Sequence, residues 1–256
     1  MGTLRQNAAI LACQVALAVV FLAAWQFATA HAAVSTFLFG SPSAIWDSVR
    51  STVEDGSLAR DVGVTALETF LGFLIGNVVG MVIGLLLWYS RFIARVIEPF
   101  VLALGSIPII ALAPVVIIWL GTGLASKVAM STLSVVVVAL VTAYKGATSV
   151  DADYLTLLRA LGASKNQIFR KLIIPVAMTD IFAGLRLSVG FALVGAIVGE
   201  FISSSEGLGH AIFKAGSLYM ISAVFAALLV TIALALCMTA IVGRLERMLM
   251  PWSEPR

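Results

Sequence analysis

Long apolar blocks alternate with short polar segments along the chain, and the blocks have the length of membrane-spanning helices. A helix needs about 20 apolar residues to cross the hydrocarbon core of a bilayer. The blocks that meet this length are 8–30, 62–88, 98–119, 127–147, 180–202 and 218–243. The pattern predicts an all-α, polytopic membrane protein with about six transmembrane helices. The first block also resembles a secretory signal that ends in "ATAHAA", but its apolar run is longer than a typical signal core.

Composition agrees with this prediction. Of the 256 residues, 61% are hydrophobic and 11% are charged, whereas a globular domain is about half apolar and a quarter charged. Cys13 and Cys237 lie far apart in apolar blocks, which favours two small buried side chains over a disulfide or metal site. We expect no bound metal and no nucleic-acid partner.

The distribution of lysine and arginine predicts the orientation in the membrane. With the N-terminus inside, twelve basic residues fall on the cytoplasmic side and four on the outer side. The inner residues are Arg5, Arg91, Arg95, Lys145, Arg159, Lys165, Arg170, Lys171, Arg186, Arg244, Arg247 and Arg256, and the outer ones are Arg50, Arg60, Lys127 and Lys214. This positive-inside bias predicts that both termini are cytoplasmic. On the outer side, Ser41 and Pro42 are typical of a helix start, so we expect a short interfacial helix there.

Two of the predicted spans contain residues that are unusual for a regular helix, namely repeated glycines in one and several prolines in the other. Glycines recur every four residues from Gly72 to Gly84, which permits close packing within the chain or across a dimer. The third span contains Pro99, Pro108 and Pro114, with "GS" at 105–106. These residues favour a span broken near 105–108 that borders a transport pathway, or else a kinked packing helix.

Ionisable side chains near the membrane are few, and each needs a partner or a pathway. Asp180 and Arg186 are expected near the inner surface, six residues apart and badly placed to pair within one helix. The candidate pathway residues are Glu68, Asn77, Ser106, Pro108 and Glu200. No nucleophile, metal cluster or complete phosphate-binding loop is recognisable, since "GTGLASKV" at 121–128 lacks the second glycine and the hydroxyl residue after the lysine.

The segment after the fourth span is polar and predicts a helical hairpin in the cytoplasm. Tyr154, Leu157, Leu158 and Leu161 follow a helical period and form one apolar stripe. Gly162 is typical of a helix end, so a short helix is expected over 153–161. A basic second helix follows and reaches Pro175. The hairpin docks on a partner or, alternatively, is a linker packed on its own spans.

The stretch "LRALGASKNQIFRKLIIPVAMTDIFAGLRLSVGFALVGAIVGEF" resembles the EAA loop and following span of the inner-membrane permeases of ATP-binding-cassette (ABC) importers. "SPSAIWDSV", "TALETFLGF", "SIPIIALAPVVIIWLGTGLASK" and "GLG" at 207–209 are similar to the branch that imports sulfonates, nitrate, taurine and related solutes. Three departures stand out. Thr156, Leu157 and Leu158 replace the EAA triplet, Thr179 or Asp180 replaces a second proline, and Leu67 and Glu68 stand where relatives commonly have arginine.

The resemblance implies a single transmembrane permease domain over 1–256 with an EAA-like coupling loop at about 148–179, in a bacterial inner membrane. It also implies a homodimer, two ABC ATPase subunits that use ATP and Mg, an external substrate-binding protein, and a small, anionic solute. The chain itself is then not an enzyme and binds no cofactor. The implied coupling residues are Tyr154, Thr156, Leu157, Leu158, Arg159, Leu161, Gly162, Ala163 and Pro175.

Other classes of protein remain as alternatives. An ion-coupled secondary transporter predicts ionisable residues at the membrane midplane or inverted repeats, and neither is clear in this sequence. An energy-coupling subunit of a vitamin importer also uses coupling helices, but the "GLG" loop and the single EAA-like hairpin argue against it. An intramembrane enzyme needs a nucleophile or metal constellation.

Overall fold

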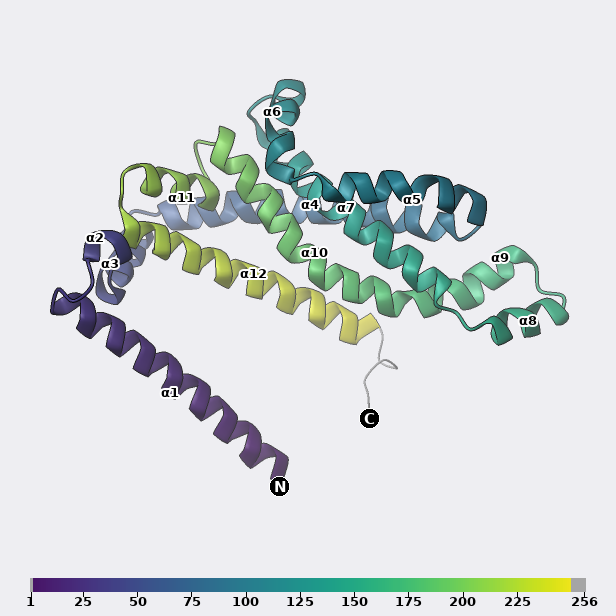
Figure 1. The fold of residues 1–256 in the computed structure, drawn as a ribbon, viewed down its shortest axis with the longest axis horizontal. Helices are drawn as coiled ribbons and strands as arrows, with labels where there is room; N and C mark the ends of the chain where they lie inside the picture. The colour runs from purple at the N-terminus through teal and green to yellow at the C-terminus, as the bar shows by residue number, and fades with distance from the viewer. Residues whose placement is uncertain (1, 250–256) are drawn as a thin grey trace. The chain divides into compact units, whose positions relative to one another are not determined.

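The computed structural model describes residues 2–249, and every regular element within that range is helical. The longer helices are α1 (Gly2–Ala30), α4 (Ser57–Leu87), α5 (Arg91–Ser106), α6 (Ile109–Leu120), α7 (Leu124–Thr148), α10 (Ile174–Ser203) and α12 (Ile221–Leu249) (Figure 1). The shorter elements are α2 (Thr36–Phe39), α3 (Pro42–Glu54), α8 (Ala152–Ala160), α9 (Lys165–Ile168), a π-helical turn η1 (Phe169–Ile173) and α11 (Leu208–Ser217). The predicted all-α fold is therefore confirmed. Arg256, counted above as an inner basic residue, lies outside the described range.

Five helical segments among the described residues are long and apolar enough to cross a membrane, and the bent pair α5–α6 brings the number to six. The longest such segment is Lys165–Ser203, in which α9, η1 and α10 follow one another without a break. This agrees with the number of spans predicted from the apolar blocks, so the polytopic fold is confirmed.

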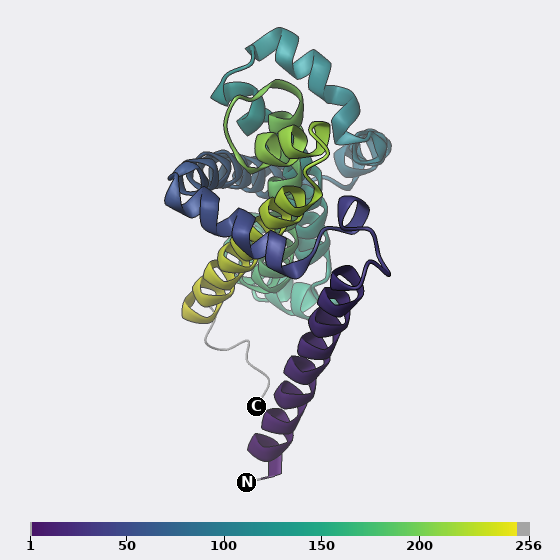
Figure 2. The ribbon, with the colours of Figure 1, turned by 90° about the vertical axis from the view of Figure 1, so that its left-hand side faces the viewer.

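The third span is broken rather than kinked. α5 and α6 meet at an angle of 94°, and Figure 2 shows α6 running across the direction of α5. Ile107 ends α5 in an extended conformation with ψ of 121°, and Pro108 then precedes the first turn of α6. A proline disfavours helical backbone at the residue before it, which explains the position of the break. Pro99 and Pro114 instead lie inside α5 and α6.

The chain divides into two compact units, and each is described by itself. One unit contains the chain up to Arg60 together with Ala211–Val230. In it, Ser41 caps α3 by accepting a hydrogen bond from the Ala44 amide at 3.3 Å, with Pro42 as the first helical residue, so the predicted helix start is confirmed. The single domain predicted over 1–256 stays a prediction.

The second unit contains Asp61–His210 and the chain from Thr231 onward, and it is built around the packed pair α7 and α10. The glycine stripe of α4 packs against α7 within this unit. A Cβ atom added at Gly72 would lie 2.2 Å from Ser131 Cβ, and one at Gly84 would lie 2.4 Å from the Leu140 carbonyl oxygen. The stripe is therefore used for packing inside the chain.

The two cysteines differ from expectation. Cys13 and Cys237 are both exposed, whereas their apolar surroundings predicted buried side chains. The reason lies in the helices that carry them, because none of the apolar span of α1 and only 17% of that of α12 is buried within the chain. An apolar block in a membrane chain can face lipid, so its hydrophobicity does not imply burial.

Candidate functional site

The predicted cytoplasmic hairpin begins with α8, whose two ends are set by local sequence. Asp151 caps the start by accepting a hydrogen bond from the Asp153 amide at 2.9 Å. At the other end Gly162 has a φ of +75°, and the amides of Gly162 and Ala163 donate to the carbonyls of Arg159 and Leu158, each at 3.0 Å. These two bonds form a Schellman motif, which satisfies the last carbonyls of the helix. The helix covers Ala152–Ala160, one residue earlier than predicted.

The apolar side chains of α8 divide between two faces. Leu155 and Leu158 pack inward, against a buried cluster formed by Ala147, Ile168 and Ile173. The outward residues are Tyr154, Leu157 and Leu161, with exposed fractions of 61%, 55% and 73%. Leu158, assigned to the docking stripe from its spacing, therefore lies on the face that holds α8 to its own chain.

The remaining predicted coupling residues lie outside this stripe. The Thr156 hydroxyl donates to the Ala152 carbonyl at 2.9 Å and is exposed on another face of α8. Arg159 is exposed, Ala163 packs against the buried cluster, and Pro175 lies exposed in the first turn of α10. Their roles in coupling stay a prediction.

A polar and aromatic joint connects the hairpin to the turn between α4 and α5. Lys165 Nζ donates to the Tyr89 carbonyl at 2.6 Å, and the Tyr89 hydroxyl donates to Asn166 Oδ1 at 2.8 Å. The Phe169 ring lies 5.6 Å from that of Trp88 and 4.7 Å from that of Tyr89, between ring centroids. Sequence reasoning missed this joint, although an aromatic pair at the end of an apolar block is typical of a membrane interface.

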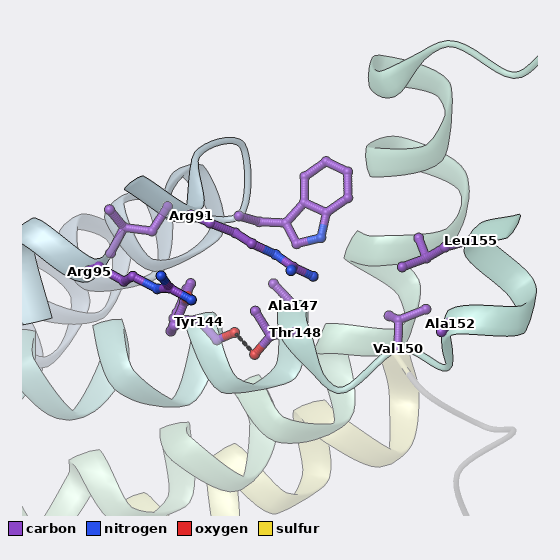
Figure 3. A pocket seen from close by; sticks show the side chains of 10 residues that line it. Arg91, Arg95, Tyr144, Ala147, Thr148, Val150, Ala152 and Leu155 are labelled. Carbon is purple, nitrogen blue, oxygen red and sulfur yellow. Dashed lines mark hydrogen bonds between the residues drawn. The ribbon is translucent and has the colours of Figure 1, made fainter. Parts of the chain in front are cut away.

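Two adjoining cavities of about 400 and 420 Å³ lie beside the joint and share Trp88, Arg91 and Leu155. Basic side chains dominate their polar lining, namely Arg91, Arg95, Arg159 and Lys165. Figure 3 shows Arg91 and Arg95 extending from α5 above Tyr144 and Thr148 of α7. None of the described residues that line these two cavities is acidic. The charged side chains that line the two cavities are therefore all cationic.

A buried polar cluster occupies the opposite end of α4 and α10. Glu200 is fully buried and accepts hydrogen bonds from the Thr65 hydroxyl at 2.6 Å and the Gly209 amide at 2.5 Å. The Thr65 oxygen also accepts from the Leu208 amide at 2.8 Å, and Asp61 accepts from the Gly207 amide at 2.9 Å. Side chains of α4 and α10 thus hold the "GLG" turn through its backbone amides.

Glu68 and Lys127 extend this cluster into a third cavity, of about 560 Å³. Both are 3% exposed. Lys127 Nζ donates to the carbonyls of Ser203, at 3.0 Å, and Thr122, whereas Glu68 Oε2 is buried without a hydrogen-bond partner. Because Glu68 lies one turn from Thr65 on α4, the structure brings the predicted residues Glu68 and Glu200 into one cluster. Lys127 was missed, since its sequence position indicated only a cation near a loop.

The other predicted pathway residues lie elsewhere. Asn77 is 2% exposed and donates to the Phe73 carbonyl at 2.8 Å, nine residues and about 13.5 Å along α4 from Glu68. Ser106 and Pro108 are exposed at the break between α5 and α6. The structure therefore places these five residues in three locations, and their role as a pathway stays a prediction.

The two ionisable residues that were expected near the inner surface, Asp180 and Arg186, have separate partners. Asp180 Oδ1 lies 3.5 Å from Lys145 Nζ, and Arg186 forms an ion pair with Glu246 of α12. This agrees with the expectation that Asp180 and Arg186 do not pair with each other. Residues 2–249 include no group of three or more histidine, cysteine, aspartate or glutamate side chains that could hold a metal ion.

Comparisons with known proteins agree on one family. A family model described as "Binding-protein-dependent transport system inner membrane component" matches residues 76–250. The formylaminopyrimidine transport permease protein ThiX of Halalkalibacterium halodurans is 32% identical, over 74% of this chain and 72% of that protein. The putative aliphatic sulfonates transport permease protein SsuC of Bacillus subtilis is 29% identical, over 92% of this chain and 86% of that protein.

A solved structure shows the same fold. The MetNI methionine ABC transporter, in an inward-facing conformation, matches with a TM-score of 0.68 and 22% identity, over 76% of this chain and 96% of that chain. The chain therefore belongs to the family of binding-protein-dependent transport system inner membrane components, and it is a multi-pass permease subunit that forms the translocation pathway of an ABC importer.

Proposed function

We propose that α8 is the coupling helix of this permease and that it seats in a groove on a cytoplasmic ABC ATPase. The observation that carries this proposal is the division of the faces of α8. Leu155 and Leu158 hold the helix to its own chain, while Tyr154, Leu157 and Leu161 form an exposed apolar stripe. A nine-residue helix is marginal by itself, and an apolar stripe outside the bilayer is typical of a docking surface.

The joint provides a route by which motion of the ATPase would reach the membrane. Displacement of α8 would move α9 and η1, and the bonds of Lys165 and Asn166 to Tyr89 would transfer that motion to the turn before α5. α5 ends at the break at Ile107. Because no continuous helix crosses this break, the angle between α5 and α6 could change without breaking helical hydrogen bonds. This motion would switch the permease between an inward-facing and an outward-facing state, each favoured by a different ligand.

The remaining assembly is proposed from the family. Two copies of this chain would join two ATPase subunits and an external substrate-binding protein. ATP and Mg would be used by the ATPases, and this chain would bind no cofactor. Both termini would be cytoplasmic, in agreement with the twelve basic residues on the predicted inner side.

The solute is proposed to be small and to carry an anionic group, and the third cavity, lined by Glu68 and Lys127, favours one class of such solutes. Lys127 is an ammonium with three protons, two of which already bond to carbonyls, so one donor is left for an anionic group. Glu68 lines the same cavity, and its Oε2 is buried without a hydrogen-bond partner. A solute with a sulfonate and an ammonium group, such as taurine, matches both. Two relatives are named for the transport of small polar solutes, aliphatic sulfonates for one and a formylaminopyrimidine for the other, which supports this proposal.

The docking proposal is tested with the substitution Leu157→Glu, which places a charge on the exposed stripe. We expect the purified permease to lose most of its ATPase subunits and to lose ATP-dependent uptake, because a charge buried in an apolar groove is costly. Ala160→Ser is the matched control, since Ala160 is exposed on the same helix outside the stripe. Equal ATPase retention in both variants would overturn the proposal.

A further inference from the structure

Two neighbouring stripes run along α5 from its first turn. One is cationic and consists of Arg91 and Arg95. The other, one residue later at each turn, is apolar and exposed, with Phe92 at 78%, Val96 at 48% and Phe100 at 66%. Because each residue advances about 100° around a helix, the apolar stripe starts about a quarter turn from Arg91 at Phe92 and winds to the opposite side of α5 at Phe100. α5 is therefore amphiphilic, with its cationic residues in the first two turns and an apolar row that winds away from them.

The cationic end carries two like charges, both of them exposed. Arg91 and Arg95 lie four residues apart, a spacing at which like charges destabilise a helix. No ion pair or side-chain hydrogen bond within residues 2–249 involves either guanidinium, and both line the cavity of about 400 Å³ beneath α8. Tyr144 and Thr148 line the same cavity, and the Thr148 hydroxyl donates to the Tyr144 carbonyl at 2.9 Å. Two guanidinium groups in one cavity suit a phosphate, which arginine binds through paired hydrogen bonds.

We propose that this cavity binds the phosphate headgroup of an anionic phospholipid and that an acyl chain lies along Phe92, Val96 and Phe100. A free phosphate would use only the cationic end. Phe100 lies nine residues beyond Arg91, about 13.5 Å along the helix, which is the direction in which an acyl chain enters the bilayer. Basic pockets between transmembrane helices at the cytoplasmic surface are known to suit anionic headgroups. The inference rests on the proposed cytoplasmic position of α8.

The position of this site gives the lipid an influence on coupling. Arg91 lines both adjoining cavities, and the second cavity also contains Arg159 of α8 and Lys165 of the joint. A bound anion would reduce the repulsion among these cations and so stabilise the hairpin against the α4–α5 turn. Anionic lipid would then increase the ATPase activity that is coupled to transport, without itself contacting the ATPase.

The experiment measures lipid binding to the full permease by native mass spectrometry in detergent. Phosphatidylglycerol, phosphatidylcholine and inorganic phosphate are the probes. We expect phosphatidylglycerol to bind to the unmodified chain, and the double substitution Arg91→Gln and Arg95→Gln to weaken that binding about tenfold or more. Arg244→Gln with Arg247→Gln is the matched control, since it removes two exposed cations of α12 from the same predicted side and should change binding less than about twofold.

Further measurements distinguish a bound phospholipid from free inorganic phosphate. Phe100→Ala should weaken phosphatidylglycerol binding and leave the cationic pair intact. The inference is overturned if inorganic phosphate competes as well as the lipid, if phosphatidylcholine binds equally, or if both double variants behave alike. It is also overturned if Phe100→Ala separates two copies of the chain without affecting lipid, because the apolar row is then a subunit interface. Leu157→Glu tests the coupling helix independently, so failure of one proposal is distinguishable from failure of the other.

Discussion

At the scale of single residues, the clearest feature is how carboxylates hold the "GLG" turn. Gly207 has a φ of +103°, a region that non-glycine residues rarely adopt, and a Cβ atom there would lie 2.3 Å from Glu200 Oε1. Glu200 and Asp61 accept the backbone amides of this turn. Glycine is required at this position for two independent reasons, one of backbone conformation and one of space.

Substitution of Gly207 should therefore destabilise the protein. We expect Gly207→Ala to cost roughly 1–3 kcal/mol from backbone strain, with a further loss from displacing the buried Glu200 carboxylate. The measurement is the thermal unfolding midpoint of the purified permease. Gly63→Ala is the control, because a Cβ atom at Gly63 meets nothing within 4 Å and alanine favours a helix. A midpoint for Gly207→Ala equal to that of the control would contradict the expected strain.

The unpaired oxygen of Glu68 leads to a second residue-scale prediction. If Glu68 accepts a hydrogen bond from the ammonium of an aminosulfonate, Glu68→Gln should raise the KM for taurine roughly tenfold to a hundredfold. A simple alkanesulfonate without an amine should be affected less. Uptake into proteoliposomes that contain the complete transporter measures both. Glu54→Gln removes an exposed carboxylate of α3 from outside the cavity, and it should leave both KM values unchanged. Equal effects of Glu68→Gln on the two solutes would exclude this role.

At the scale of elements, α5 and α8 each present two different surfaces, and we propose a separate role for each surface. α8 is held by Leu155 and Leu158 and leaves its other apolar face exposed. α5 carries a cationic stripe beside an apolar one, and it ends at a break of 94°. The α4–α5 turn leads directly into α5, and its Tyr89 bonds to Lys165 and Asn166 of α9, the helix that follows α8. Coupling in this chain is therefore proposed to run from a docked helix, through one turn, to a broken span.

At the scale of the whole molecule, orientation in the membrane is the property on which the other proposals depend. Trp46 of α3 and Tyr154 of α8 are similarly exposed, at 68% and 61%. Trp46 lies on the predicted outer side and Tyr154 on the predicted cytoplasmic side. A difference in chemical access between these two positions would report the side of the membrane and not local burial.

Labelling with a membrane-impermeant maleimide should show that difference. In a background with Cys13 and Cys237 replaced by serine, Trp46→Cys should be labelled in intact spheroplasts, and Tyr154→Cys only after permeabilisation. Labelling is measured by a shift in mass of the purified chain. The opposite pattern would reverse the orientation and place α8 outside the cell, where no ATPase could dock.

Much of this protein follows from sequence alone, because the properties concerned are local. The length of each apolar block determines a span, Ser41 with Pro42 determines the start of α3, and Gly162 determines the end of α8. Pro108 places the break in the third span through the conformation of the residue before it. The helix ends and the break depend on residues within about one helical turn, and each span depends on one continuous apolar block.

Only the tertiary structure decided which distant residues meet. Thr65 and Glu200 are 135 positions apart, and Tyr89 and Asn166 are 77 apart, so no local pattern predicts either contact. Tertiary packing also placed Leu158 on the inner face of α8 and left Cys13 and Cys237 exposed. In a membrane chain an apolar side chain can face lipid or protein with similar energy. Hydrophobicity therefore determined the spans by itself, whereas the faces by which they pack depended on the shape and polar partners of their neighbours.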